Sequence, residues 1–262
     1  NGDQTGGAGA SDYISFLTSL EAQDLANSGW NYTSPSSHIT LSFWAKSSVA
    51  KTFCVQLYTA DGTPQAYNHH YALSANTWKK VIHTFPGYAN VQFDNDANKG
   101  IEIQWNMFAG TTYTSGSTVD QWLTYNGNTS TPDDTSDWYT TNDATFEITG
   151  VQLEVGAQAT PFEHRSFGEE LQLCERYYVE DLNGGVRNAI NNNGDRIPVP
   201  AFRTKMRASP TMSASSFTEF SSGSSRTVTG FYGVGANGGG YAQLSSTPTN
   251  GVYFYANADA EL

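Results

Sequence analysis

The chain has 262 residues and a formal net charge of −12, and only 15% of its residues are charged. An acidic chain repels phosphate backbones, and the basic residues here form no run, so nucleic-acid binding is disfavoured. No apolar stretch approaches the length needed to span a bilayer, so membrane insertion is not expected. The chain carries no signal peptide and does not begin with Met, which predicts a processed product or a piece of a longer protein.

The chain is poor in charged residues and rich in Gly, Ser, Thr, Asn and Tyr. Such a chain hydrates its surface with hydroxyl and amide groups, which favours an exposed, turn-rich β protein over a helical enzyme. The length is sufficient for one large β-sandwich and a second, smaller unit. Residues 1–10 have the composition of a flexible lead-in.

Short segments in which apolar and polar residues alternate follow the lead-in. This period of two is typical of strands that bury one face. The expected strands span 13–20, 38–45, 51–58, 67–73, 78–85, 100–108 and 145–155, and residues 21–25 can form one helical turn. Turn signals such as Asp61-Gly62 separate the segments. The pattern predicts an all-β fold, with a jelly-roll β-sandwich over residues 11–165.

A long segment rich in Thr, Ser, Gly, Asn and Asp, residues 111–142, interrupts the strands. Loops of this length are usually functional or disordered, and the aromatic residues argue against disorder. Aromatic rings stack on the apolar faces of sugars, while neighbouring amides bind the hydroxyl groups. The candidate carbohydrate-binding residues of the loop are Trp122, Tyr125, Trp138 and Tyr139.

Three other tryptophans, Trp44, Trp78 and Trp105, lie in strand-like runs and are predicted to be core residues. Among the cysteines, Cys54 lies in a strand-like run and Cys174 in a helix-like run. A disulfide-dependent fold usually carries more cysteines, so two buried thiols are the simpler interpretation.

Residues 166–180 have the best helical pattern in the chain, and they are expected to form a short connecting helix. Ser166 can cap this helix, with Glu169 as its capping-box partner. The C-terminal block, residues 181–262, is expected to form a smaller β domain. It has little apolar material for a core of its own, so we expect it to rely on the first domain or on other copies of itself.

Within the C-terminal block, Tyr232 and Tyr241 are candidates for carbohydrate contacts at an exposed tip. The alternative interpretation is packing of these rings at a three-fold axis. The sequence does not separate the two.

Metal-binding patterns are weak. Asp94, Asp96 and Asn98 offer oxygen ligands at alternate positions and resemble the start of a calcium loop, but the rest of the loop pattern is missing. A structural calcium ion is one interpretation, and a polar hairpin turn is the other; no further cofactor is expected. The histidines lack zinc-binding spacing, and the adjacent His69 and His70 point to opposite faces of a strand, so a zinc site is not expected.

Catalytic patterns are weaker still. Asp133, Asp134 and Asp137 cluster near Trp138, and they are interpreted as a solvated acidic loop rather than the carboxylate pair of a glycan-cleaving enzyme. Nucleophile-elbow, P-loop and dinucleotide motifs are absent. The chain is therefore predicted not to be an enzyme.

Two stretches carry a resemblance to a known family. The first comprises LSFWAKS at 41–47 and SANTWKK at 74–80, and the second comprises ATFEITGVQLEVG at 144–156, ATPFEHR at 159–165 and CERYY at 174–178. Together they resemble the carbohydrate-binding-module-like jelly roll of tail fibres and other virion structural proteins of tailed bacteriophages, many of them marine. The resemblance covers residues 10–180.

This resemblance implies a tail-fibre or receptor-binding protein of the virion that attaches, without catalysis, to a host cell-surface glycan or receptor. It also implies a homotrimer that contacts other virion proteins and has the C-terminal β domain as its distal, trimer-forming tip. Two alternatives stay open: a virion decoration or adaptor protein with a structural jelly roll, and a carbohydrate-binding module of a secreted bacterial protein. A glycan-depolymerising tailspike is disfavoured, because such proteins are usually longer and often β-helical.

Overall fold

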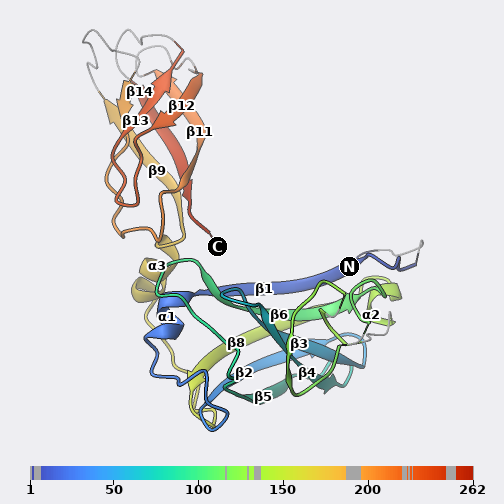
Figure 1. Cartoon of the computed structure of the whole chain (residues 1–262). Coiled ribbons are helices and arrows are strands. Elements are labelled where there is room, and N and C mark those ends of the chain that lie inside the picture. The colour runs from blue at the N-terminus through green and yellow to red at the C-terminus, as the bar shows by residue number, and fades with distance from the viewer. Residues whose placement is uncertain are drawn as a thin grey trace. The chain divides into compact units, whose positions relative to one another are not determined.

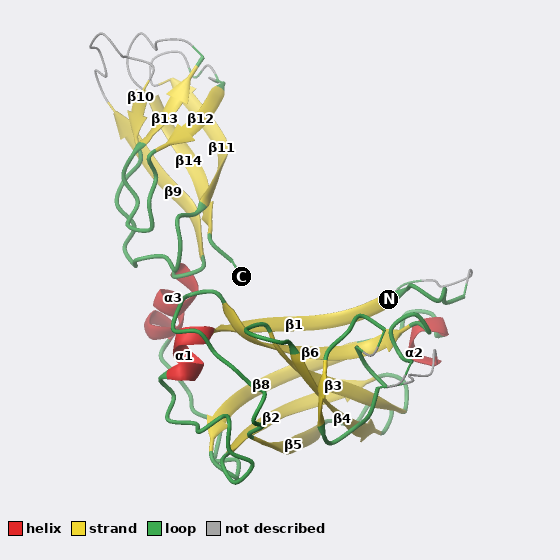
Figure 2. Cartoon of the chain, viewed as in Figure 1, coloured by secondary structure: helices red, strands yellow, loops and turns green. Residues whose placement is uncertain are grey.

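Two compact units, residues 1–163 and residues 164–262, make up the computed structural model of the chain (Figure 1). Strands dominate both units, and the helices are short (Figure 2). The structure describes residues 2, 7–115, 117–128, 130–132, 137–186, 196–219, 223, 225, 227–245 and 252–261. Within these residues no helix is both long enough and apolar enough to cross a membrane.

The first unit is a sandwich of two antiparallel sheets. One sheet has five strands in the order β1 (Tyr13–Glu21), β6 (Lys99–Ala109), β3 (Lys51–Thr59), β4 (Gln65–Leu73) and β7 (Trp122–Thr124). The other has three strands in the order β5 (Lys79–Pro86), β2 (His38–Ser47) and β8 (Phe146–Val155). The connections include the short helices α1 (Ala22–Ala26) and α2 (Asp137–Thr140). Most consecutive strands lie in different sheets, so the chain crosses the sandwich repeatedly, as in a jelly roll.

The core lies between the two sheets. In β2, Leu41 and Phe43 belong to the buried cluster that fills this space. The ring of Phe43 lies edge-on to those of Tyr71 and Trp105 in the five-stranded sheet, with centroids 5.3 and 5.7 Å apart. T-shaped aromatic pairs add roughly 0.5–1.5 kcal/mol each beyond the burial of their surface. The fold class predicted from the alternating pattern is confirmed.

Described parts of segment 111–142 contact the outer face of the five-stranded sheet, while β7 within this segment is the edge strand of that sheet. Asn68 on β4 donates a hydrogen bond from Nδ2 to Ser117 Oγ at 2.8 Å. Beneath the segment, Gln56 and Asn68 are almost completely buried, and Gln56 Nε2 donates to Asn68 Oδ1 at 2.9 Å. These polar side chains can be buried because they bond to each other and to the covering segment.

The second unit contains helix α3 (Phe167–Glu175) and two three-stranded antiparallel sheets. The first sheet has the order β11 (Thr211–Glu219), β14 (Val252–Asp259) and β9 (Tyr178–Val186). The second has the order β10 (Arg196–Pro198), β13 (Tyr241–Leu244) and β12 (Val228–Tyr232). Within the described residues, the smaller β domain expected after the helix is therefore present.

This second unit buries apolar residues of its own. One cluster includes Phe217, Leu244 and Phe254, and another is built around Met206 and Ala258. These clusters are small, in keeping with the limited apolar material expected, and the reliance on the first domain or on other copies stays a prediction. The alternation along β13 and β14 buries alanines as well as large side chains, so few large residues are needed to fill the space between sheets.

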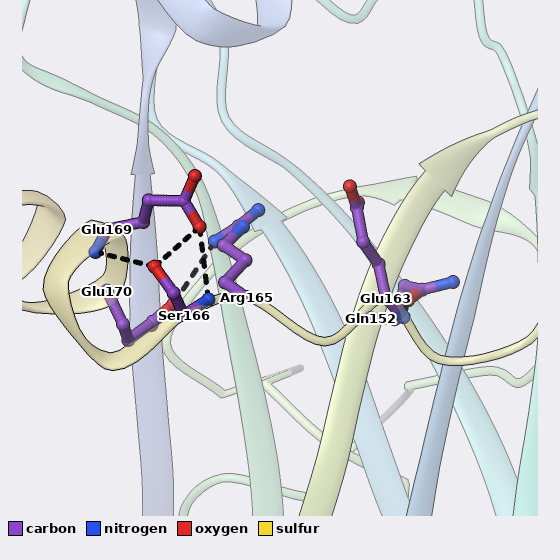
Figure 3. Close-up of polar contacts among 6 residues, drawn as sticks. All are labelled: Gln152, Glu163, Arg165, Ser166, Glu169 and Glu170. Atoms are coloured by element: carbon purple, nitrogen blue, oxygen red, sulfur yellow. Dashed lines mark hydrogen bonds and ion pairs between the residues drawn. The ribbon is translucent and has the colours of Figure 1, made fainter.

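Helix α3 begins where the sequence predicts and ends earlier. Ser166 Oγ accepts a hydrogen bond from Glu169 N–H at 3.3 Å, and Ser166 N–H donates to Glu169 Oε2 at 3.0 Å, so the predicted capping box is present (Figure 3). The helix ends at Glu175 rather than at residue 180. From Tyr178 onward the chain forms β9, because β14 provides a partner strand in which Asp259 pairs with Tyr178.

The boundary between the two units differs slightly from the expected domain boundary at residue 165. The boundary falls after Glu163, so α3 belongs to the second unit. Of the lead-in expected at residues 1–10, residues 1 and 3–6 lie outside the described residues. Ala10 O accepts a hydrogen bond from Thr112 N–H at 2.9 Å, so this residue is part of the hydrogen-bond network of the sandwich.

Both cysteines are free thiols. Cys54 is buried in β3, whereas Cys174 is exposed on α3. The interpretation as two buried thiols is therefore correct for Cys54 and wrong for Cys174. The physical reason is that α3 has no buried residue at all.

Candidate functional site

Two of the predicted loop aromatics attach the loop to the sandwich. Trp138 is only 4% exposed, and its Nε1 donates to Thr145 O at 3.1 Å. The ring of Tyr139 packs on Phe108 of β6 with centroids 4.8 Å apart. Trp138 is a core residue in this arrangement, and Tyr139 is half-buried against the sheet.

The other two predicted loop aromatics are half-buried. Trp122 Nε1 donates to Pro86 O at 2.7 Å, and the Trp122 ring lies edge-on to Tyr67 with centroids 5.4 Å apart. Tyr125 lies edge-on to Tyr58, with centroids 4.7 Å apart. Because each ring packs against a different neighbour, the structure does not gather the four loop candidates into one open surface.

Two tryptophans predicted to be core residues are instead open to solvent. Trp44 is 42% exposed and Trp78 is 41% exposed, whereas Trp105 is 4% exposed. Trp44 stands between Phe43 and Ala45, which are both buried, so the period of two along β2 turns its ring away from the core. The core prediction is correct for Trp105 and wrong for Trp44 and Trp78.

A returning segment, residues 156–163, is fastened to β8 beside these tryptophans. Gln152 Oε1 accepts a hydrogen bond from Glu163 N–H at 2.9 Å (both residues are labelled in Figure 3). Glu154 Oε2 accepts one from Thr160 N–H at 3.1 Å. The side chain of Gln152, followed by Thr160, holds the pKa of the Glu154 carboxyl below its usual range. The carboxylate form of Glu154 therefore fastens the segment at neutral pH.

The returning segment contributes Phe162, which is 43% exposed. Phe162 and Trp44 both approach Gly150, a residue of β8 with a φ of +58°. A Cβ atom at Gly150 would lie 3.4 Å from Cδ1 of Trp44 and 3.8 Å from Cδ2 of Phe162. Both rings therefore lie beside Gly150, and it is the positive φ of this residue, rather than a lack of space, that favours glycine there.

Four exposed apolar side chains of β2, β5 and their flanking segments are together called the aromatic face: Trp44, Trp78, Ile82 and Phe162. A cation borders it, since Lys46 Nζ lies 5.2 Å from the centroid of the Trp78 ring and 2.7 Å from Glu147 Oε1. A surface of this kind can stack on an apolar ring face, and the charged and amide groups beside it can bind hydroxyl groups.

The two tyrosines predicted in the C-terminal block come together. Tyr232 on β12 pairs with Tyr241 on β13, and their rings stack with centroids 5.4 Å apart. The guanidinium of Arg196 lies 4.6 Å from the centroid of the Tyr241 ring. Tyr232 is 46% exposed, and its ring lies over Gly230, where a Cβ atom would be 3.1 Å from ring atoms. These residues form a second, smaller aromatic surface.

The calcium candidates lie in a turn that bonds to itself. Asp96 Oδ1 accepts a hydrogen bond from Asn98 N–H at 2.9 Å, and Asn98 Nδ2 donates to the other oxygen of Asp96. Asp94 N–H donates to Asp61 Oδ2 at 3.0 Å. Burial, with Asp94 and Asp96 nearby, raises the pKa of Asp61. Asn98 thus directs N–H groups at Asp96, which does not fit a cage of oxygen ligands, and calcium binding here stays a prediction.

Three residues that the spacing argument did not join lie together elsewhere in the first unit. His69 on β4, His83 on β5 and Asp120, in the segment before β7, have ligand atoms that all lie within 4.8 Å of one another. Only the pairing of β4 with its neighbours and the packing of the two sheets bring them together, so no local sequence signal could have revealed the cluster.

The fold and these surfaces define an all-β sandwich protein with a solvent-facing aromatic surface in each unit. No protein-family model matches the chain, and no curated protein matches it. Of the predicted acidic loop, Asp133 and Asp134 lie outside the described residues, while Asp137 begins α2. The expectation that the chain has no catalytic activity stays a prediction.

Proposed function

We propose that this protein is a non-catalytic receptor-binding protein, a tail fibre or related virion protein of a tailed bacteriophage, that attaches to host surface glycans. The observation that carries the proposal is the aromatic face. Large apolar side chains such as Trp44 and Trp78 are seldom exposed together without a binding role. Their rings suit the apolar faces of sugars, and the virion setting rests on the resemblance of residues 10–180 to phage jelly rolls.

Association of several chains would combine such weak contacts. The exposed side chains of helix α3 provide a surface through which the chains could associate. Phe167, Leu171 and Cys174 are exposed and follow one another at intervals of four and three residues. This spacing is that of a coiled-coil seam, in which apolar side chains of neighbouring helices interlock. A homotrimer joined at α3 would present three aromatic faces, and linked weak sites can bind about 100-fold more tightly or better than a single site.

The glycan proposal is tested on the full chain with an array of bacterial surface glycans, followed by calorimetric titration with each glycan that binds. Trp44→Ala and Trp78→Ala should each weaken binding by at least about tenfold, because each removes a stacking ring. Leu17→Ala is the matched control, since Leu17 is an exposed apolar residue of β1 outside the aromatic face. Equal affinity in all four proteins would reject this surface as the binding site.

The trimer proposal is tested by measuring the mass of the chain in solution. The expected species has three chains, and Leu171→Glu should convert it to a monomer by introducing a charge into the seam. Leu171 is 41% exposed on α3, which has no buried residue, so this variant retains its fold. A monomeric wild-type chain would contradict the trimer and favour a carbohydrate-binding module of a secreted bacterial protein.

A virion adaptor or decoration protein is the second candidate, and the same aromatic face favours it, since exposed apolar patches also mark protein interfaces. In that case no glycan on the array binds. A density map of the virion would then show the aromatic face covered by another virion protein rather than open to solvent.

A further inference from the structure

The cluster of His69, His83 and Asp120 spans the two layers of the sandwich. His69 belongs to β4 of the five-stranded sheet, and His83 belongs to β5 of the three-stranded sheet. Asp120 comes from the segment that leads into β7, and its backbone N–H donates to Asn68 O at 2.8 Å. Three separate stretches of chain therefore meet where one edge of each sheet lies close to the other.

The ligand atoms of the cluster are close enough together to be drawn onto one small cation. His69 Nδ1 lies 2.7 Å from Asp120 Oδ1, and His83 Nε2 lies 3.6 Å from the same oxygen. In a tetrahedral zinc site, bonds of about 2.0–2.2 Å hold neighbouring ligand atoms roughly 3.3–3.5 Å apart. The two measured separations lie on either side of this value.

A second observation points to a missing ligand at the same place. His83 Nε2 is buried, and within the described residues it has no hydrogen-bond partner. Buried polar atoms are normally paired, so this nitrogen calls for an explanation.

We propose that His69 Nδ1, His83 Nε2 and the Asp120 carboxylate bind one divalent transition-metal ion of the zinc type. Two imidazoles and a carboxylate are a donor set that Zn²⁺ accepts, and the fourth position goes to water. Asp120 is 53% exposed, so the ion and its water have access from solvent. This site does not depend on the aromatic face, and it holds whether or not the protein binds glycans.

Metal binding requires both imidazole rings to leave their stacked arrangement, and it sets the tautomer of His69. The imidazole rings of His69 and His83 are stacked, with centroids 3.6 Å apart and 19° between their planes, so both must turn about their Cβ–Cγ bonds to aim at one ion. His69 Nδ1 lies within hydrogen-bond distance of Asp120, so a proton on Nδ1 would move to Nε2. That tautomer change releases no net proton. Tyr67 and Phe85 flank the His83 ring and limit how far it turns.

The bound ion would cross-link the two sheets. It would join β4 to β5 and tie the covering segment to both through Asp120. Because the apo cluster already has its donors within 4.8 Å, little chain ordering is needed on binding. Zinc should therefore raise the thermal unfolding midpoint of the first unit, since a ligand that binds only the folded state stabilises it.

The experiment titrates the metal-free full chain with ZnCl₂ by calorimetry. The expected result is one Zn²⁺ per chain, with affinity reduced by at least about tenfold in both Asp120→Asn and His83→Gln. Asp120 has a φ of +59°, a conformation that Asn tolerates well, so Asp120→Asn removes the charge and keeps the backbone. His70→Gln is the matched control, because His70 is the neighbouring histidine on the opposite side of β4.

Two further controls keep the result interpretable. Cys174→Ser removes the exposed thiol and should leave the affinity for Zn²⁺ unchanged. Co²⁺ added to the wild-type chain should give the intense visible absorption of a four-coordinate ion, a readout that needs no variant. The proposal is overturned if Asp120→Asn and His83→Gln bind Zn²⁺ as the wild type does, or if Co²⁺ shows only the weak spectrum of the hydrated ion.

Discussion

At the residue scale, the tryptophans of the first unit divide by the face of the strand on which they stand. Trp105 points between the sheets and is 4% exposed, while Trp44, also in a strand, points outward and is 42% exposed. The two side chains have the same transfer free energy from water, so only the direction of the strand face separates a core residue from a surface residue. Stability and binding are therefore expected to depend on different tryptophans.

Substitution should separate these two roles. Trp105→Ala leaves a cavity between the sheets and should lower the free energy of unfolding by about 3–5 kcal/mol. Trp44→Ala removes a ring that lies outside the core and is 42% exposed, and it should lower the free energy of unfolding by less than about 1 kcal/mol. Denaturant unfolding of both variants checks the prediction. A loss for Trp44→Ala as large as that for Trp105→Ala would mean that the aromatic face belongs to the core.

At the element scale, the stability of helix α3 depends on hydrogen bonds at its N-terminal end rather than on packing of buried side chains. It has no buried residue, so the capping box of Ser166 and Glu169 is a main source of its stability. Arg165 Nη1 adds an exposed ion pair with Glu170 Oε2 at 3.5 Å, a contact that contributes little in water (Figure 3). A helix held in this way is sensitive to single changes at its first turn.

The capping box gives a testable prediction. Ser166→Ala removes the acceptor of the Glu169 N–H and should destabilise α3 by about 1 kcal/mol. Faster amide hydrogen exchange at residues 167–175 is the expected readout. Ser166→Thr keeps a hydroxyl group and should restore most of the protection. Equal exchange in the Ala and Thr variants would show that the cap does not stabilise the helix.

The same box predicts a pH dependence. The backbone N–H and then the hydroxyl of Ser166 hold the pKa of Glu169 below its usual value of 4.5. Since the folded-state pKa is the lower one, the contribution is present above pH 4.5 and is lost as the pH falls through the folded-state value. Titration of the Glu169 side chain by NMR should show a pKa that rises in Ser166→Ala, and an unchanged pKa would contradict this account.

At the scale of the whole molecule, each unit has its own buried clusters. The first unit has one large core between its sheets, and the second has smaller clusters around Phe254 and Met206. The division after Glu163 matters for any truncation, because a cut at residue 180 would fall inside β9 and remove α3 from the second unit.

The two units should therefore fold separately. Fragments 1–163 and 164–262 should each unfold in one cooperative transition, because each contains complete sheets and a core. Calorimetry of the two fragments checks this, with a cut after residue 180 as the control that should yield a poorly folded C-terminal piece. Loss of cooperative unfolding in fragment 164–262 would mean that its clusters need the first unit or further copies of the chain.

Local sequence patterns predicted the strands of the sandwich, except for β7 within the expected loop, and the start of α3. Alternation of apolar and polar residues and a capping box are local signals, and they do not depend on the rest of the chain. The prediction that the helix extends to residue 180 is wrong. From Tyr178 onward the chain forms β9, because β14 provides a partner strand.

Only the tertiary structure decided which faces stay open and which distant residues meet. Alternation shows that Trp44 and Phe43 point in opposite directions, but not which of the two faces becomes covered. Residues such as Ser117 contact the outer face of one sheet, whereas the aromatic face of the other sheet is exposed, and His69, His83 and Asp120 meet only when the sheets pack. Such outcomes depend on contacts between residues far apart in the chain, for which the sequence pattern carries no local trace.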